Sequence, residues 1–437
     1  MSPLRETVLD MLLKAEKQNG SHAILSDAVS AEVFEKNKDL DQKEKAFIKR
    51  LYEGTLEKRI NLDYRINRYS NTPVRKMKPV MRNVLRMAAY ELVFMDSSAG
   101  YAVCSESVEL VKKRGLKGLS GFANAVLRKI ADEKDKEILP ERGEDPTKHF
   151  SVCYSVPEEI VKLLMNERGL EETEQILRAQ NLIPPVPIRF RADMSSGEIG
   201  KAKDAITAAG VRLRQSSRCE LVYLAESVGD LRKLPGYDEG LFTVQDASGA
   251  YALLQAGINK GDTVVDVCAS PGGKSLLASE LTGPEGTVIS GDISEKKISR
   301  IKENALRMRA ENIKTSVHDA SVTDPELIGK ADVLILDVPC SGLGVMGKKR
   351  DIKYNTDTGR LEDLPVLQWE IAKACAGYVR QGGKLFYSTC TIRRTENEDM
   401  AERICRELGF EKVKGPEQLL PDEEGHDGFF YCVMTKS

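Results

Sequence analysis

The sequence contains no apolar run of the length that a membrane-spanning helix needs. Such a helix takes roughly 18 consecutive apolar residues, and no segment of this 437-residue chain comes near that length. The first residues, Met1-Ser-Pro-Leu-Arg-Glu6, are charged where a secretory signal would turn apolar. The composition, with 41% hydrophobic and 30% charged residues, is that of a globular chain. We therefore expect a cytoplasmic protein with no membrane contact.

Metal-ligand and disulfide patterns are also missing. The nine cysteines are odd in number and never form a C-x-x-C pair, and the four histidines are isolated from one another. Zinc sites have closely spaced ligands, and disulfide frameworks usually have an even number of cysteines. The sequence therefore predicts neither a metal site nor a disulfide framework. The histidines are His22, His149, His318 and His426.

Charge is distributed unevenly along the chain. The total of 65 basic and 67 acidic residues gives a net charge of −2, which by itself argues weakly against a nucleic-acid partner. Residues 1–139, however, carry 26 basic and 20 acidic residues, and residues 58–86 contain nine basic side chains and one acidic one. Charge alone leaves open whether this segment binds RNA or is a solvated helix face. The nine candidates for RNA contact are Lys58, Arg59, Arg65, Arg68, Arg75, Lys76, Lys78, Arg82 and Arg86.

The chain divides into three parts. In residues 1–139, apolar side chains recur three and four positions apart, which predicts an all-helical bundle. Residues 140–235 begin with a polar linker, continue with helices at about 157–180, and then follow a strand, helix, strand, strand pattern that is typical of a small α+β module. Pro235-Gly236 is the expected end of that module. Residues 236–437 form the third part.

The third part has the pattern of a doubly wound α/β domain. Apolar runs of strand length alternate there with helical segments. In such sheets ligands bind at the carboxyl ends of the strands, so the residues that follow the strands are candidate site residues. The expected strands are 263–268, 287–290, 314–317, 332–337 and 384–390, and the expected helices are about 273–281, 294–308, 365–380 and 396–408.

A glycine-containing loop follows the first of these strands. A glycine pair between a strand and a helix lets the backbone approach a ligand closely, and the helix N-terminus favours anionic or carboxylate groups. A Walker A loop would need glycine where this chain has Cys268, and the G-x-G-x-x-G spacing is absent. A tight structural turn is the alternative interpretation. The loop residues are Cys268, Ala269, Ser270, Pro271, Gly272, Gly273 and Lys274.

Acidic residues stand at the ends of the next two strands. Asp292 ends the second strand, and Asp319 follows the strand at 314–317. In this topology such a carboxylate can accept hydrogen bonds from a ribose diol. Each of them alone could equally cap a helix. Together they favour a nucleoside ligand that needs no pyrophosphate pocket, and S-adenosylmethionine is a ligand of that kind.

Two cysteines directly follow strands of the same sheet. They lie in Asp337-Val-Pro-Cys340-Ser-Gly and in Ser388-Thr-Cys390. A single cysteine is usually a small buried apolar residue, and this is our interpretation of Cys104, Cys153, Cys219, Cys375, Cys405 and Cys432. Two cysteines at the ligand-binding edge of one sheet favour a chemical role.

These motifs resemble those of the RNA cytosine-5 methyltransferase family, in which C-A-x-P-G-G-K-[TS] binds S-adenosylmethionine and D-x-P-C-S-G and S-T-C each carry a cysteine. All three occur within residues 236–437 in the family's order. Residues 1–139 resemble the NusB-like RNA-binding domain fused to the bacterial 16S ribosomal RNA branch of that family, with Ala123-Asn-Ala-Val-Leu-Arg-Lys129 a typical match. His426-Asp-Gly-Phe-Phe430 matches the family's last strand. The resemblance covers essentially the whole chain, and it departs only at Ser270 and Val338, where alanine is usual and no functional group is lost.

The resemblance implies a multidomain protein. It would comprise an all-α NusB-like bundle (residues 1–139), linker helices with a small α+β RNA-binding module (140–235) and an α/β Rossmann-like methyltransferase domain (236–437). The implied cofactor is S-adenosylmethionine, and the implied partner is 16S ribosomal RNA not yet assembled into a mature subunit. The protein would act as a monomer without a metal.

The resemblance also implies roles for the site residues. Carbon 5 of cytosine is a poor nucleophile, and adding a thiolate to carbon 6 makes it enamine-like. The family assigns that nucleophile to Cys390 and assistance with release to Cys340. Asp337 would orient cofactor and base, and Lys274 would supply positive charge.

Three alternatives remain open from the sequence. The chain could be a non-catalytic RNA-binding factor of ribosome assembly that kept the fold. It could be a cytosine-5 methyltransferase that acts on transfer RNA. It could also be a nucleotide phosphohydrolase that uses Gly273-Lys274-Ser275.

Overall fold

The computed structural model describes residues 3–18, 26–95, 99–350, 352–355 and 358–436. They form two compact units, which we call the helical unit and the α/β unit. The helical unit comprises the described residues of Met1–Leu177 and Lys349–Asn355, and the α/β unit comprises those of Arg178–Lys348 and Thr356–Ser437. Met1, Ser2 and His22 lie outside the described residues. No helix in the described ranges is long and apolar enough to cross a membrane.

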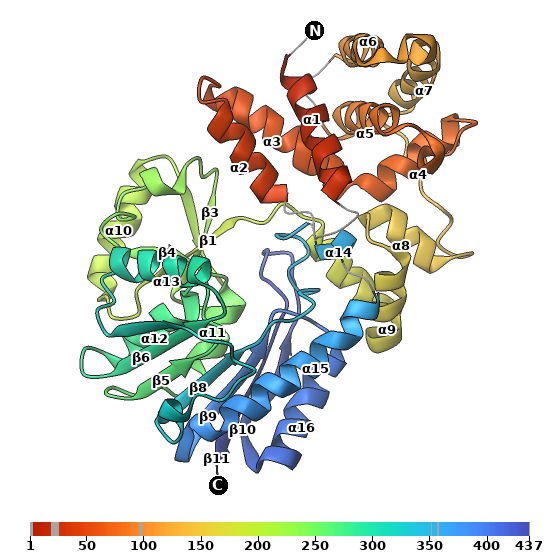
Figure 1. Ribbon diagram of the computed structural model, residues 1–437. Helices are drawn as coiled ribbons and strands as arrows, with labels where there is room; N and C mark the ends of the chain where they lie inside the picture. The colour runs from red at the N-terminus through yellow and green to blue at the C-terminus, as the bar shows by residue number, and fades with distance from the viewer. Residues whose placement is uncertain (1–2, 19–25, 96–98, 351, 356–357, 437) are drawn as a thin grey trace. The chain divides into compact units, whose positions relative to one another are not determined.

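The first part of the helical unit is a bundle of helices, as predicted (Figure 1). Each helix buries an apolar face in it. Pro79 stands in the first turn of α5, where its missing N–H costs no hydrogen bond, and Val84 and Leu85 are fully buried. Asp41 and Glu44 form a capping box that starts α3. The helices are α1 (Pro3–Gln18), α2 (Ser26–Lys36), α3 (Gln42–Glu57), α4 (Arg59–Tyr69), α5 (Pro79–Phe94), α6 (Gly100–Val111) and α7 (Ser120–Asp132).

Two segments beyond residue 139 also belong to the helical unit. The helices α8 (Pro146–Tyr154) and α9 (Glu158–Gln180) extend it to Leu177, although α9 is interrupted at Gly169, whose φ is +77°. The short segment Lys349–Asn355, which includes α14 (Ile352–Asn355), comes from far along the chain. Within it the Tyr354 hydroxyl donates a hydrogen bond to the Glu57 carbonyl at 3.0 Å. The boundary between the two compact units therefore lies later in the chain than residue 139.

The α/β unit begins with a small antiparallel sheet of order β2-β3-β1-β4, accompanied by α10. A capping box of Ser195 and Glu198 starts α10. The sequence predicted that this module ends at Pro235-Gly236, which is wrong, because β4 lies beyond those residues and pairs with β1. The elements are β1 (Val186–Phe190), α10 (Ser196–Ala208), β2 (Arg212–Gln215), β3 (Val222–Glu226) and β4 (Phe242–Val244).

The second sheet of the α/β unit has seven strands in the order β10-β11-β9-β8-β5-β6-β7. The strands from β5 to β9 are parallel, and β11 is antiparallel to both of its neighbours. This is the predicted Rossmann-like arrangement. The strands are β5 (Thr263–Asp266), β6 (Thr287–Asp292), β7 (Ile313–Val317), β8 (Ala331–Asp337), β9 (Val379–Thr389), β10 (Phe410–Leu419) and β11 (Phe429–Lys436).

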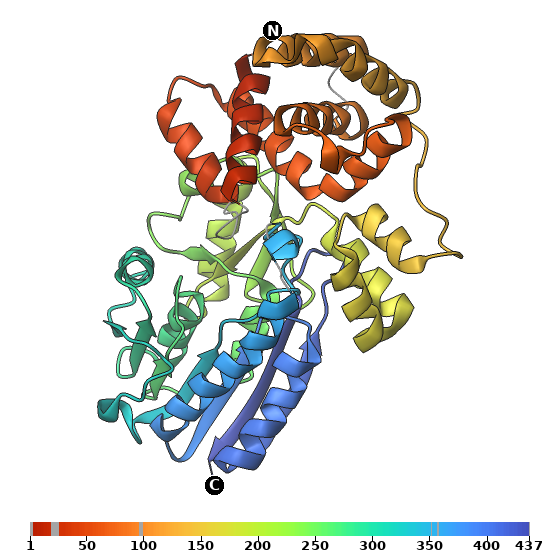
Figure 2. The ribbon, with the colours of Figure 1, turned by 45° about the vertical axis from the view of Figure 1, so that its right-hand side comes forward.

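Helices cover both faces of this sheet. The face that includes Leu334 and Leu385 packs against α15 and α16, which lie side by side in Figures 1 and 2. The opposite face, which includes Val333 and Phe386, packs against α11 and α12. Burial on both faces explains why the central strands have continuous apolar sequences. The helices are α11 (Ala247–Leu254), α12 (Gly273–Thr282), α13 (Glu295–Arg307), α15 (Thr358–Cys375) and α16 (Glu398–Leu408).

The C-terminal end of the sheet differs from the sequence prediction. His426-Asp-Gly-Phe-Phe430 was expected to be the last strand, but β11 begins only at Phe429. The strand β10 was not predicted at all. Its sequence Phe410-Glu-Lys-Val-Lys-Gly-Pro-Glu-Gln-Leu419 has one buried residue, Phe410, because it lies at the edge of the sheet. An edge strand of this kind shows no apolar alternation that the sequence could reveal.

Candidate active site

The candidate site residues lie at the carboxyl ends of neighbouring parallel strands. The loop at 268–274 follows β5, Asp292 ends β6, Asp337 ends β8, and Cys390 follows β9. The strand order changes direction at the β5–β8 pair, since β6 and β7 continue on one side and β9 on the other. Such a switch point is where ligands bind in open α/β sheets. The fold therefore brings the predicted residues to one edge.

Gly272 allows the loop after β5 to turn into α12. It has a φ of +106°, in the left-handed region that residues with side chains rarely adopt, and it caps the helix. The backbone N–H of Ser270 donates a hydrogen bond to Asp292 Oδ2 at 3.0 Å. This bond ties the loop to the end of the neighbouring strand β6, so that the position of the loop backbone depends on the Asp292 side chain.

Asp292 is buried, and its other oxygen is also engaged. Asp292 Oδ1 accepts hydrogen bonds from the backbone N–H of Ile293 at 2.7 Å and from Lys297 Nζ at 2.8 Å. The side chain of Ile293 itself is 61% exposed. Asp319 follows β7 on the surface, where its carboxylate accepts hydrogen bonds from the N–H and hydroxyl of Ser321 at 2.9 and 2.7 Å. Both predicted acids therefore stand at the expected edge.

Sequence reasoning missed a further acid, Asp266, at the end of β5. Its Oδ2 accepts a hydrogen bond from the Ser275 hydroxyl at 2.7 Å, and Ser290 in turn donates to Ser275 at 2.9 Å. Its Oδ1 is buried and has no hydrogen-bond partner among the described residues. Burial raises the pKa of Asp266 to about 7. The signal that could have found it is its place at the end of a strand, which it shares with Asp292 and Asp337.

Lys274 and Asp337 form a partly buried ion pair at this edge. Lys274 Nζ lies 2.6 Å from Asp337 Oδ2, and Ser388 donates a hydrogen bond to the other oxygen, Oδ1, at 2.9 Å. The ammonium also lies over the ring of Phe429, 4.8 Å from its centroid. Burial lowers the pKa of Lys274, but Asp337 more than compensates, and the pKa is raised. Because Lys274 is bonded to a carboxylate, it is poorly placed to serve a phosphate, which disfavours the phosphohydrolase alternative.

The two predicted cysteines face each other. The sulfur atoms of Cys340 and Cys390 lie 3.3 Å apart, within hydrogen-bonding distance for thiols. The hydrogen bond with Cys390 and burial together hold the pKa of Cys340 well above its ordinary range. The next residues along both loops, Ser341 and Thr391, are also paired, with their hydroxyl oxygens 2.6 Å apart. The two loops therefore run side by side over two residues.

Gly344 lets the Cys340 loop approach the Cys390 loop. Its backbone N–H donates a hydrogen bond to the Cys390 carbonyl at 3.1 Å. A Cβ atom at this position would lie only 2.7 Å from the same carbonyl oxygen, closer than real Cβ atoms come. The second glycine of the S-G-L-G sequence is thus required by close backbone packing.

The nine basic candidates of residues 58–86 divide into two groups. Arg65 is only 7% exposed, and its guanidinium donates to Asn61 Oδ1 at 3.1 Å. Four more of the candidates have partners within the protein. Lys58 pairs with Glu57 at 3.3 Å, and the Arg59 guanidinium lies 4.0 Å from the centre of the Tyr354 ring. Arg82 pairs with Glu16 and Arg86 with Asp63, each at 2.6 Å. The exposed members are Arg68, Arg75, Lys76 and Lys78.

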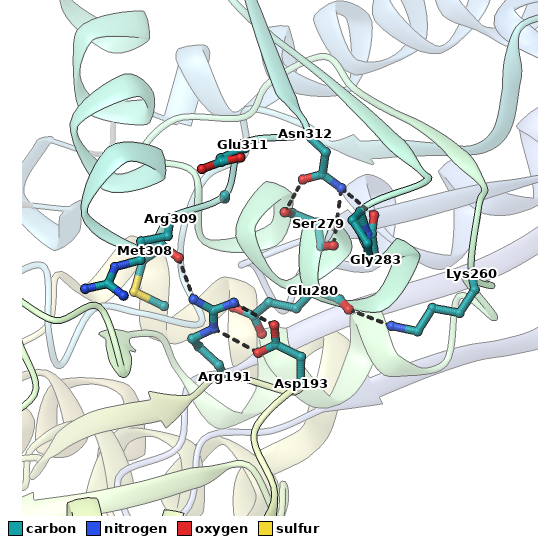
Figure 3. A pocket seen from close by; sticks show the side chains of 12 residues that line it. Arg191, Asp193, Lys260, Ser279, Glu280, Gly283, Met308, Arg309, Glu311 and Asn312 are labelled. Carbon is teal, nitrogen blue, oxygen red and sulfur yellow. Dashed lines mark hydrogen bonds and ion pairs between the residues drawn. The ribbon is translucent and has the colours of Figure 1, made fainter. Parts of the chain in front are cut away.

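A polar cavity of about 350 Å³ lies at the opposite edge of the sheet (Figure 3). Its lining includes Lys260, Gly283 and Asn312, which precede β5, β6 and β7. The polar groups in it largely bond to one another. Arg191, for example, pairs with Asp193 and donates to the Met308 carbonyl at 2.8 Å. None of the predicted site residues lines this cavity.

The described residues contain no group of three His, Cys, Asp or Glu side chains that could hold a metal ion. The nine cysteines are free thiols. His426, which the sequence placed near the last strand, is buried, and its ring nitrogens bond to Asp422 and Ser216 at 2.8 Å each. Its contacts are those of a structural histidine.

Comparison with known proteins identifies the family. Residues 253–435 match the model of the 16S rRNA methyltransferase RsmB/F family, and residues 2–132 match that of the NusB family. The chain is 31% identical to "Probable ribosomal RNA small subunit methyltransferase B" of Bacillus subtilis, over 99% of this chain and 98% of that protein. The chain belongs to the 16S rRNA methyltransferase RsmB/F family.

Further relatives agree. Ribosomal RNA small subunit methyltransferase B of Vibrio cholerae is 32% identical over 83% of each chain. The crystal structure of the protein PH0851 has the same fold, with a TM-score of 0.78, 22% identity and 98% of both chains covered. Membership in the RsmB/F family confirms the predicted methyltransferase activity, the S-adenosylmethionine cofactor and action on RNA.

Proposed function

We propose that this RsmB/F family member transfers a methyl group from S-adenosylmethionine to carbon 5 of a cytosine in 16S ribosomal RNA. The observation that carries the proposal is the pair of thiols 3.3 Å apart at the carboxyl edge of the sheet, beside the loop expected to hold the cofactor. A simple methyl transfer to an oxygen or nitrogen would need no thiol. Two thiols suit a reaction in which a covalent bond to the substrate is first made and later broken.

Cys390 is the nucleophile in this proposal. A thiolate attacks far better than a thiol, and the ammonium of Lys274 is close enough that a negative charge on Cys390 raises the pKa of Lys274. The Cys390 sulfur forms a bond to carbon 6 of cytosine, and the ring electrons move to carbon 5. S-adenosylmethionine, when bound, supplies the methyl group for that carbon. The ring then carries both the methyl group and the original hydrogen on carbon 5.

Cys340 acts in the release step. The carbon 5 proton passes to a water molecule, and its electron pair re-forms the carbon 5–carbon 6 double bond as the sulfur of Cys390 departs as a thiolate. Cys340 remains protonated, because Cys390 and burial raise its pKa, so it can donate a hydrogen bond to the departing sulfur. Asp337, bonded to Lys274 and Ser388, would orient the groups around the reacting ring.

The residues at the edge suit S-adenosylmethionine. The left-handed turn at Gly272 lets the loop backbone come close to a ligand. The carboxylates of Asp292 and Asp319 can accept ribose hydroxyl bonds, and the exposed side chain of Ile293 offers an apolar face for the adenine ring. We therefore assign cofactor contact to residues 268–274, Asp292, Asp319 and Ile293.

The RNA must present an unstacked cytosine, because attack at carbon 6 requires access to the face of the ring. We propose that the exposed Arg68, Arg75, Lys76 and Lys78 contact RNA phosphates. The substrate would be 16S ribosomal RNA that is not yet assembled into a mature subunit, where such a base is accessible. A monomer would suffice, because all the proposed groups belong to one chain.

Bisulfite sequencing of RNA from cells with and without the protein tests the proposal. Bisulfite converts cytosine but spares 5-methylcytosine. We expect one cytosine in 16S ribosomal RNA to resist conversion only when the protein is present. Resistance that depends on the protein in a transfer RNA, but not in 16S ribosomal RNA, would contradict the substrate assignment. No dependence in any RNA would favour the non-catalytic assembly factor.

A further inference from the structure

Two hydrogen bonds hold the peptide groups on either side of Cys340. Gln368, on α15, donates from Nε2 to the carbonyl of Pro339 at 2.9 Å. Glu396, at the end of a short helical turn after β9 (Arg394–Glu396), accepts from the backbone N–H of Ser341 through Oε2 at 2.9 Å. Cys340 is therefore fixed from both neighbours in sequence, by two side chains that lie elsewhere in the chain.

These two side chains also bond to each other. Gln368 Nε2 donates to Glu396 Oε2 at 2.9 Å. The amide and the carboxylate together therefore form a hydrogen-bonded bridge between the Pro339 carbonyl and the Ser341 N–H. Both residues are 0% exposed. The Tyr387 hydroxyl fixes the backbone of Glu396 by donating to its carbonyl at 2.6 Å. Burying a carboxylate is costly, and the raised pKa of Glu396 shows that burial acts against its charge.

The adjacent residue, Asn397, holds the other cysteine loop. Its Nδ2 donates to the Thr391 carbonyl at 3.1 Å, and its Oδ1 accepts from the Thr389 hydroxyl at 2.5 Å. Thr389 and Thr391 flank Cys390 in the sequence. Two adjacent residues thus hold different loops: Glu396 is hydrogen-bonded to the loop of Cys340, and Asn397 to the loop of Cys390.

We propose that Gln368 and Glu396 are positioning residues for Cys340, which keep its thiol against the Cys390 sulfur while the methylated RNA is released. This inference rests on the proposed release role of Cys340. Neither residue touches the substrate. Without the bridge, the Ser341 N–H and the Pro339 carbonyl lose their partners, and the Cys340 loop can drift from the 3.3 Å separation. Attack by Cys390 has its own support in Asn397 and is not affected.

The test compares Glu396→Ala, Glu396→Gln and Gln368→Ala in the full-length protein. Each variant is incubated with target RNA and S-adenosylmethionine, and the protein–RNA adduct is measured on a denaturing gel. We expect Glu396→Ala and Gln368→Ala to accumulate adduct and to lose about tenfold in multiple-turnover rate, the effect of about one lost hydrogen bond. Methyl transfer in a single turnover should remain within about twofold of the wild-type rate, because attack and transfer precede release.

Glu396→Gln distinguishes hydrogen bonding from charge. Its amide oxygen can accept both bonds that Oε2 accepts. Its amide nitrogen would take the place of Oε1, which accepts no hydrogen bond among the described residues and lies 3.8 Å from the Arg393 guanidinium, too far for a hydrogen bond to be lost. We expect this variant to release RNA nearly as the wild type does. Glu370→Gln is the control, because Glu370 lies on α15, the helix of Gln368, and its half-exposed carboxylate pairs with Lys373, so the variant should change nothing.

The outcomes separate this inference from the proposed function. Cys340→Ala serves as the reference. If Cys340→Ala accumulates adduct while Glu396→Ala and Gln368→Ala release RNA normally, the positioning role is overturned and the release role of Cys340 stands. If Cys340→Ala itself accumulates none, the proposed function fails. A Glu396→Gln variant as defective as Glu396→Ala would also overturn positioning by hydrogen bonds. Should Glu396→Ala not fold, Gln368→Ala and Glu396→Gln carry the comparison.

Discussion

The sulfur atoms of Cys340 and Cys390 lie 3.3 Å apart, although 50 positions separate the two residues in the chain. They meet because β8 and β9 are parallel neighbours whose ends are in register, with Asp337 opposite Ser388. Two negative charges at that distance would repel strongly. The hydrogen bond with Cys390 and burial hold the pKa of Cys340 well above its ordinary range, so Cys340 keeps its proton. In the proposed function, Cys340 is therefore the hydrogen-bond donor and Cys390 the nucleophile.

Asp292→Ala should weaken S-adenosylmethionine binding by roughly tenfold or more. The variant removes charge-assisted hydrogen bonds, each worth about 1.5 to 3 kcal/mol, and it also releases the Ser270 N–H that ties the loop to β6. Isothermal titration calorimetry measures the affinity, and Glu303→Ala, on the exposed side of α13, is the control. Unchanged affinity in a folded Asp292→Ala protein would contradict the cofactor assignment.

Replacing Arg68, Arg75 and Lys78 together by alanine should flatten the salt dependence of RNA binding. Each contact to a single-stranded phosphate contributes about 0.7 to the slope of log affinity against log salt concentration, so three contacts give about two units. Filter binding at several salt concentrations measures the slope. The control replaces three exposed basic residues of the α/β unit, Lys373, Arg406 and Lys412. Equal slopes for wild type and triple variant would place the contact surface elsewhere.

Asp266→Asn should change how the stability of the α/β unit depends on pH. The pKa of Asp266 is raised from 3.8 to about 7 in the folded protein. Between those values the folded state holds a proton that the unfolded state has released, so wild-type stability falls as pH rises from about 4 to about 7 and then levels off. At about 1.4 kcal/mol for each pKa unit, the loss reaches roughly 4 kcal/mol. Urea unfolding at a series of pH values should give a flatter profile for the asparagine variant, and parallel profiles would refute this role.

Gly344→Ala should impair both stability and turnover. The added methyl group would lie 2.7 Å from the Cys390 carbonyl oxygen, so the two cysteine loops would have to move apart. A strained core substitution of this kind costs about 1–3 kcal/mol. Gly377→Ala is the matched control, since no atom lies within 4 Å of a Cβ at that position. Thermal unfolding and methylation assays should show a defect for Gly344→Ala only. Equal behaviour of both variants would mean that the loops tolerate the displacement.

The edge that carries the candidate site could be predicted from the sequence because its determinants are local. Apolar runs mark the buried parallel strands, and the residues that follow them, such as Asp292, Cys340 and Cys390, necessarily come to one edge of the sheet. Asp266 was missed because it stands among apolar residues, and only the structure shows its burial and its bond to Ser275.

Long-range partners could not be predicted from the sequence. Residues 58–86 look uniformly basic, but Arg82 and Arg86 meet Glu16 and Asp63 in the folded bundle. Nothing in the local pattern of Lys349–Asn355 indicates that it belongs to the helical unit. Likewise, the bridge of Gln368 and Glu396 depends on two elements that pack together only in the fold. In each case the partner is far away in the sequence, and local periodicity carries no information about such contacts.

The adduct formed by each cysteine variant tests the central claim most directly. Cys390→Ala and Cys340→Ala are incubated with target RNA and S-adenosylmethionine and examined on a denaturing gel. Cys390→Ala should neither methylate RNA nor form an adduct, because the attacking sulfur is gone, whereas Cys340→Ala should methylate once and accumulate the adduct. An adduct with Cys390→Ala but not with Cys340→Ala would mean that the two roles are exchanged, and full turnover by both variants would contradict covalent catalysis altogether.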